Sequence, residues 1–231
     1  MSMHIGIIGG MGTEAGLVTV KIICDTFRAK NLPYPKLTLI SDETIPDRSA
    51  FLLGKSEQNP ARKISLIGEQ LLSLGVDHII IACFTAHSPD IIDQVHPNVS
   101  SKLVSLFTPL RNLPKSNKRV GVLATNGSQK SAVFEFHFPA CEIVYPDHGD
   151  QEVLMSSIYD IKKRGVYPKV VENIIHIASN MSEKVDMIVL GCTELLLLEF
   201  PPDFFIINPV KLLSYQLAKM TLMPPKSHLT T

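Results

Sequence analysis

The stretch VDHIIIAC, residues 76–83, returns later in the chain as VDMIVLGC, residues 185–192. Each copy is a short apolar run that ends in a cysteine, and such a run is typical of a buried strand in a parallel sheet. A second pair, IGII at residues 5–8 and VGVL at residues 120–123, repeats in the same order. Two copies are too few for a solenoid, in which many repeats stack. The repeat therefore indicates two half-size units related by a pseudo-twofold axis.

Strand-like and helix-like segments alternate in both halves, which predicts parallel βαβ units with right-handed crossovers. We therefore expect an α/β fold of two similar Rossmann-like subdomains with parallel sheets. Because ligands bind beyond the carboxyl ends of such strands, the site is expected in the cleft between the subdomains. Strands are expected at residues 4–8, 37–40, 76–82, 103–107, 119–124, 142–145, 185–190 and 204–207, and the main helices at 14–30, 60–75, 151–164, 168–181 and 210–220.

A linker is expected between the halves at PLRNLPKSNK, residues 109–118, because the segment is polar and contains two prolines. The expected boundaries place residues 1–106 and 211–231 in the first subdomain and residues 107–210 in the second. The tail after Pro224-Pro225 is expected to fray.

The composition excludes several classes of protein. With 45% apolar and 19% charged residues among 231, the chain can bury a sizeable core, so disorder is excluded. Basic and acidic residues balance at 22 each, so we expect no nucleic-acid partner, which would call for a basic excess. No apolar run approaches the roughly 20 residues that span a bilayer, and no secretion signal is visible. We therefore expect no membrane partner and a cytoplasmic location.

Two of the four cysteines, Cys83 and Cys192, occupy equivalent positions just past a buried strand and before a helix start. The free N–H groups and dipole of a helix start lower the pKa of a thiol, which favours acid–base chemistry. A single cysteine at a strand end is more often a small core residue, but the repeated position favours a shared site. Cys24 and Cys141 fit the core interpretation, and we assign them no role.

Four segments resemble the signatures of a known family: GGMGTE (9–14), IPDR (45–48), CFTAH (83–87) and GCTEL (191–195). In this order they resemble the aspartate/glutamate racemase superfamily, and IPDR resembles its aspartate racemase branch. The resemblance implies an isomerase, an amino-acid racemase that works without pyridoxal phosphate, with no other cofactor and no metal. It also implies a small-molecule amino-acid substrate, an active site between two α/β domains and a homodimer.

The resemblance also implies roles for single residues. Cys83 and Cys192 would be the catalytic bases, one thiolate removing the Cα proton while the other thiol delivers a proton to the opposite face. Arg48 would bind a substrate carboxylate through its planar fork. Lys163 resembles a second substrate-binding cation, although a basic last turn also suits the helix dipole. Further substrate contacts are expected from Thr13, Thr85, Thr125, Ser128 and Thr193, and support for these groups or the thiols from His87 and Glu194.

One residue departs from the family pattern, because Phe84 stands where the first cysteine motif usually has Asn. A phenyl ring cannot make the hydrogen bonds of that amide, which leaves the substrate open between aspartate, glutamate and a less acidic amino acid. It also keeps open a non-catalytic, amino-acid-binding relative.

Two further interpretations compete. Residues 10–15 match GxGxxA after a strand and before a helix, which would suit a dinucleotide, but Glu14 would then lie close to the pyrophosphate. A lyase or hydrolase on the same fold could use Cys192 alone, or Cys83 with His87 as nucleophile and base. No third, orienting group is evident for that pair.

Overall fold

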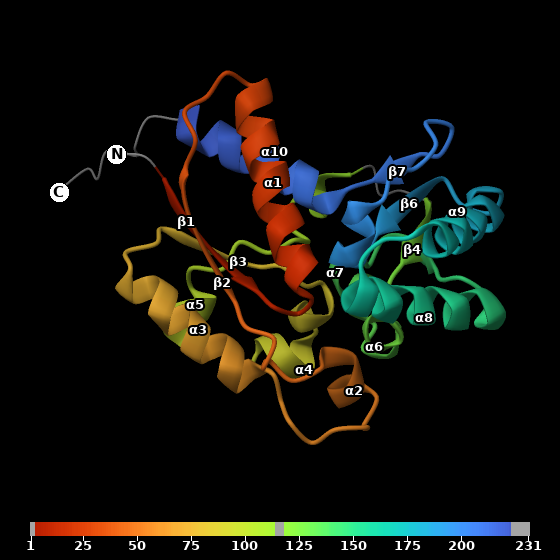
Figure 1. Cartoon of the computed structure of the whole chain (residues 1–231), viewed down its shortest axis with the longest axis horizontal. Coiled ribbons are helices and arrows are strands. Elements are labelled where there is room, and N and C mark those ends of the chain that lie inside the picture. Colours follow the sequence, from red (N-terminus) through yellow and green to blue (C-terminus); the bar gives the residue numbers. More distant parts are fainter. Residues whose placement is uncertain (1–2, 114–117, 223–231) are drawn as a thin grey trace.

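Two parallel sheets, one in each half of the chain, confirm the predicted α/β fold. The computed structural model describes residues 3–113 and 118–222. The sheets have the orders β2-β1-β3 and β5-β4-β6-β7, so in each half the first strand lies between the second and the third (Figure 1). The strands are β1 His4–Gly9, β2 Lys36–Ser41, β3 His78–Ile81, β4 Arg119–Leu123, β5 Glu142–Val144, β6 Met187–Leu190 and β7 Ile206–Ile207.

Helices connect these strands in the expected alternation. Figure 1 shows the last helix, α10, returning from the second half to lie near α1. In the part of the chain that is described, no helix has the length and apolar character needed to cross a bilayer. The helices are α1 Thr13–Ala29, α2 Arg48–Leu52, α3 Ala61–Ser73, α4 Pro89–Ile92, α5 Pro97–Ser100, α6 Asn126–Lys130, α7 Val133–His137, α8 His148–Arg164, α9 Pro168–Ser182 and α10 Pro209–Leu222, with 3-10 turns η1 Thr85–His87, η2 Pro109–Asn112 and η3 Thr193–Leu197.

The first sheet is buried on both faces. Successive residues of β1 point to opposite sides, so Ile5 packs in a core cluster with Phe27 of α1, whereas Ile8 packs in another with Leu71 of α3. The cluster around Ile5 continues into the second half, where it includes Val122 of β4. A shared core therefore fixes the two sheets relative to each other, and with them the loops that follow β3 and β6.

One predicted strand, at residues 103–107, is wrong. Leu103 forms an isolated parallel bridge with Ile79, and the backbone then turns, with the Phe107 N–H donating to Ser105 Oγ at 3.2 Å. The turn brings the ring of Phe107 into an aromatic cluster at 5.0–5.3 Å from two other phenyl rings. Packing of this one side chain therefore overrides the strand propensity of the run.

The division into two subdomains, residues 1–106 with 211–231 and residues 107–210, remains our proposal. The packing of α10 against α1 supports it, with Thr26 Oγ1 and Ser214 Oγ hydrogen-bonded at 2.7 Å. Part of the predicted linker, residues 114–117, and the ends of the first subdomain, residues 1–2 and 223–231, lie outside the described residues.

The turn after β1 requires glycine at one position. Gly10 has a φ of +85°, and a Cβ there would overlap the backbone of Asp42. Gly10→Ala is therefore expected to lower the free energy of unfolding by more than the ~1–2 kcal/mol that the left-handed conformation alone costs. Urea unfolding measures this. Gly75→Ala is the matched control, because Gly75 has a similar φ of +77° but open space around it; equal losses in the two variants would contradict the expectation.

Candidate active site

Cys83 and Cys192 lie past the ends of β3 and β6 and are 7% and 6% exposed. Burial raises the pKa of Cys192 well above its ordinary value, the Glu194 carboxylate raises it further, and Cys83 adds to the effect. Both cysteines, in their thiolate forms, also contribute to raising the pKa of Lys162. The two cysteines therefore lie in one electrostatic environment, as a shared site requires.

A chain of contacts runs from Cys192 to a partly buried lysine. The Cys192 thiol donates to Glu194 Oε2 at 2.8 Å, and Glu194 Oε1 lies 3.7 Å from Lys162 Nζ. Burial works to lower the pKa of Lys162, but the charge of Glu194, joined by that of Cys192 when it is ionised, outweighs burial and raises it. Cys192 is therefore held as a thiol beside a carboxylate, and Lys162 is held as a cation beside both.

Sequence reasoning selected Lys163, but the structure places its neighbour Lys162 beside Glu194. Lys163 is exposed, whereas Lys162 faces Glu194. Adjacent helical residues differ in direction by about 100°, so only one of the two can face the site. The missed signal is the spacing along α8: Ile158 and Ile161 are buried and point inward, and Lys162 lies four residues after the first of them.

The carboxylate of Glu194 is expected to control the acidity of Cys192. Because a neighbouring negative charge raises a thiol pKa, Glu194→Gln should lower the pKa of Cys192. The test is the pH dependence of Cys192 alkylation by iodoacetamide, followed by peptide mass spectrometry in a Cys83→Ser background. Glu199→Gln, at an exposed position, should leave the pH dependence of alkylation unchanged. A higher pKa of Cys192 in the Glu194→Gln variant would contradict this account.

Arg48 is a second cation, and it is buried, with 6% of its surface exposed at the start of α2. Its guanidinium donates to the carbonyls of Met11 at 2.6 Å, Pro46 at 2.9 Å and Ile45 at 3.3 Å. Within the described residues, Nε has no hydrogen-bond partner. Neutral carbonyls orient this cation without neutralising it, so the site can accept an anionic group here.

The loop that carries Arg48 also contacts the second half. Asp47 caps α2 by accepting from the Ala50 N–H at 2.8 Å, and its other oxygen accepts from the Tyr159 hydroxyl of α8 at 3.2 Å. Tyr159 in turn lies under Lys162, with Nζ 5.6 Å from the ring centroid. Asp47 and Tyr159, which sequence reasoning did not select, thus join the two cations across the junction.

Three predicted hydroxyls meet at the same junction. Thr85 Oγ1 of η1 lies 2.9 Å from Ser128 Oγ and 3.1 Å from Thr125 Oγ1, both on or beside α6. Thr193 Oγ1 also crosses between the halves and donates to the Ala82 carbonyl at 3.0 Å. Thr13, by contrast, is exposed at the first turn of α1. The structure therefore brings Thr85, Thr125 and Ser128 together, binds Thr193 to Ala82 across the halves and leaves Thr13 at the surface.

His87 supports the loop that carries Cys83 without contacting its thiol. Nδ1 donates to the main-chain carbonyl of Cys83 at 2.8 Å, and burial lowers the pKa of His87 to about 4, so the imidazole is neutral at physiological pH. This geometry disfavours a nucleophile–base pair of Cys83 and His87, because the nitrogen nearest that cysteine is already bonded to its carbonyl.

The glycine turn after β1 does not suit a dinucleotide. A Cβ on Gly12 would lie 2.5 Å from Glu194 Oε1 and 3.3 Å from Lys162 Cγ. The turn is therefore packed against a carboxylate, which would repel a pyrophosphate. Over residues 3–113 and 118–222, no group of three or more His, Cys, Asp or Glu side chains is arranged to hold a metal ion.

A comparison with protein families decides the assignment. The model of the Asp/Glu/Hydantoin racemase family matches residues 8–211. The chain belongs to this family. Membership in this racemase family supports an isomerase, and it confirms the resemblance that the four sequence motifs carry.

Solved structures show the same fold. An aspartate racemase from Picrophilus torridus superposes with a TM-score of 0.78 over 97% of this chain and 96% of that one, at 24% identity. An aspartate racemase homologue from Pyrococcus horikoshii superposes with a TM-score of 0.68 over 96% of this chain and 100% of that one, at 22% identity. In sequence, a glutamate racemase from Corynebacterium diphtheriae is 28% identical over 168 residues, which is 65% of this chain and 61% of that protein's length.

Within this racemase fold, Phe84 is a core residue. It is 1% exposed, and its ring lies 5.3 Å from Phe107 and 5.8 Å from Phe134. The first cysteine motif of this chain therefore places an aromatic ring in the interior, where burial of a polar side chain without a hydrogen-bond partner would cost folding free energy.

Restoring the family's asparagine is expected to destabilise the protein. Phe84→Asn would empty part of the aromatic cluster and bury an amide, at a cost of about 3–5 kcal/mol in the free energy of unfolding. Urea unfolding measures the loss, and Phe136→Asn, at a phenylalanine that is 65% exposed, is the control with little change. A stable Phe84→Asn variant with faster racemisation would instead show that residue 84 reaches the substrate.

Proposed function

We propose that this chain is an amino-acid racemase of the aspartate type, which interconverts L- and D-aspartate or a related acidic amino acid without pyridoxal phosphate. One observation carries the proposal. Cys83 and Cys192 lie at equivalent strand ends beside two cations: the partly buried Lys162, 3.7 Å from the Glu194 carboxylate that accepts from Cys192, and the buried Arg48, which has only neutral carbonyls as its hydrogen-bond partners among the described residues.

Racemisation requires that a proton leave Cα on one face and that another arrive on the opposite face. In the proposed mechanism one thiolate removes the proton while the other cysteine, as a thiol, donates its own, and the reverse reaction exchanges these roles. The Cys192 thiol is available as the donor, because burial and the Glu194 carboxylate, whose Oε2 accepts the S–H hydrogen bond at 2.8 Å, keep it protonated. When Cys192 acts as the base, Lys162 favours its thiolate, since that charge lowers the pKa of Cys192.

The cations account for the proposed preference for an acidic substrate. The Arg48 guanidinium can pair with a side-chain carboxylate, and Lys162 adds a second positive charge close by. The hydroxyls of Thr85, Thr125, Ser128 and Thr193 supply donors for the α-carboxylate, where negative charge develops as the Cα proton leaves. General acid–base catalysis of this kind contributes about 10²–10⁴-fold.

The experiment that tests the function is incubation of the chain with L-aspartate in D₂O. We expect D-aspartate by chiral chromatography and loss of the Cα–H signal by proton NMR. L-Glutamate and L-alanine, tested in parallel, measure how far the two cations restrict the substrate. Binding of these amino acids without any exchange at Cα would instead support a non-catalytic relative, the alternative that the buried Phe84 keeps open.

The proposal also includes the oligomeric state and the cellular location of the protein. The resemblance to the family supports a homodimer, which light scattering on the purified protein tests directly. We also propose a cytoplasmic location, as the sequence without a visible secretion signal leads us to expect, and fractionation of the source cells would test it.

A further inference from the structure

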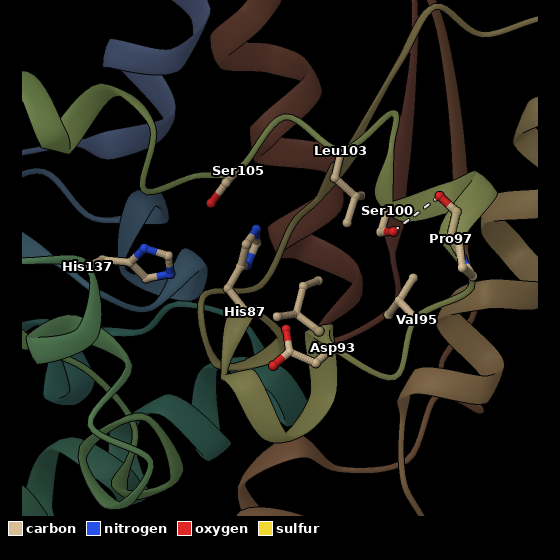
Figure 2. A pocket seen from close by; sticks show the side chains of 9 residues that line it. His87, Asp93, Val95, Pro97, Ser100, Leu103, Ser105 and His137 are labelled. Atoms are coloured by element: carbon tan, nitrogen blue, oxygen red, sulfur yellow. Dashed lines mark hydrogen bonds between the residues drawn. The ribbon is translucent and has the colours of Figure 1, made fainter.

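A cavity of about 420 Å³ lies at the junction of the two halves, beside the segment that follows Cys83. Figure 2 shows His87 and His137 among its lining residues, with Ser105 near the tip of the His87 ring. Cys83 is not among the residues that line this cavity. The cavity is therefore distinct from the proposed racemase site, although His87 contacts both.

His87 offers the cavity a hydrogen-bond acceptor. Its Nδ1 donates to the Cys83 carbonyl at 2.8 Å, so in the neutral ring Nε2 carries no proton and can only accept. Among the described residues Nε2 has no hydrogen-bond partner, and the side chain is 3% exposed. A buried acceptor without a donor is costly, and a ligand that brings a donor would remove that cost.

His137 offers a hydrogen-bond donor. Its Nδ1 lies 3.4 Å from the Arg111 guanidinium, and because arginine can only donate, this nitrogen accepts. In the neutral ring the proton therefore resides on Nε2. Burial lowers the pKa of His137 to about 4, with His87 and Arg111 contributing, so the ring is neutral at physiological pH.

Between these polar groups the lining is mainly apolar, with Ile92, Val95 and Leu103 contributing side chains. We propose that this cavity binds a small neutral molecule with an apolar body and an adjacent donor–acceptor pair, such as a carboxamide or a lactam. The N–H of the ligand donates to His87 Nε2, and its carbonyl accepts from His137 Nε2–H. A charged carboxylate is disfavoured, because it has no proton to give to His87 and Asp93 also lines the cavity.

Binding at this site acts on Cys83 through a single side chain. Hydrogen bonds to the two nitrogens of one imidazole strengthen each other, so a donor on Nε2 alters the bond from Nδ1 to the Cys83 carbonyl. Because Nε2 exposes less than 1 Å² of surface, the ligand enters by displacing a half-buried neighbour such as Ser105.

Benzamide is the probe, because it combines a phenyl ring with a neutral carboxamide. We expect a saturable change in the Nε2 shift of His87 in protein labelled with ¹⁵N-histidine, with a dissociation constant in the millimolar range. Acetophenone, which lacks the donor, and benzoate, which lacks the proton and carries a charge, are expected to leave this shift unchanged. The readout involves no turnover, so it stands even if the racemase proposal fails.

Two variants locate the binding. Ser100→Trp, at an exposed lining residue, should fill the cavity and abolish the shift, whereas Ser101→Trp, at its exposed neighbour outside the lining, should not. His137→Phe removes the donor and should weaken binding about tenfold. The proposal is overturned if benzamide leaves the His87 shift unchanged in the wild-type protein, if acetophenone shifts it equally, or if Ser100→Trp binds benzamide as the wild-type protein does.

Discussion

Racemisation of L-aspartate is expected to fall by at least ~10²-fold, and up to about 10⁴-fold, when either Cys83 or Cys192 is replaced by serine. Each cysteine serves one face of Cα, so neither can substitute for the other. A serine hydroxyl keeps the approximate size of the thiol but is far less acidic than cysteine, so it cannot supply an anion at neutral pH. The measurement is the rate of D-aspartate formation in each single variant.

The two other cysteines are the matched controls. Cys24 and Cys141 lie outside the site, and Cys24→Ser and Cys141→Ser are expected to retain the wild-type rate. If only the Cys192→Ser variant were inactive, a single cysteine would suffice for racemisation. Full activity in either Cys83→Ser or Cys192→Ser would refute the two-thiol mechanism.

Replacement of Lys162 by methionine is expected to lower kcat/KM for aspartate by about 10–10²-fold, the effect of losing one charge-assisted interaction. Lys162 lies 3.7 Å from Glu194 and lowers the pKa of Cys192. Its loss should therefore raise KM through weaker carboxylate binding and lower kcat through a less accessible Cys192 thiolate. Steady-state kinetics separate the two effects.

Lys163→Met provides the control on the same helix. Lys163 is exposed, and changes at such positions alter free energies by only about 0.5 kcal/mol, or roughly twofold in rate. Because Lys162→Met leaves the buried Glu194 without its cation, circular dichroism must show that the variant folds. Lys162→Arg keeps the charge and should restore part of the activity, and equal effects of Lys162→Met and Lys163→Met would contradict the placement of the cation.

The repeat in the sequence predicted most of the fold because buried parallel strands have a clear pattern. VDHIIIAC and VDMIVLGC contain β3 and β6, and both end at the cysteines of the site. The run at residues 103–107 shows the limit of such patterns. It is as apolar as a strand, but the ring of Phe107 packs with other aromatic residues, and that contact is visible only in three dimensions.

The site was predictable where residues belong to a motif and unpredictable where they meet through packing. Cys192 and Glu194 are two positions apart, so their contact follows from the sequence. Asp47 and Tyr159 are separated by 112 positions, and no local sequence pattern predicts their hydrogen bond. The choice between Lys162 and Lys163 depends on the rotation of α8 about its axis, which an uninterrupted run of three basic residues does not define.

The central claim is that two thiols act on opposite faces of one carbon. Initial-rate conversion of L-aspartate in D₂O, with NMR analysis of both enantiomers at low conversion, tests it most directly. The account predicts that newly formed D-aspartate carries deuterium at Cα in every molecule, while the remaining L-aspartate keeps its proton. Transfer of the original proton into D-aspartate would show that a single group serves both faces, and it would contradict the account.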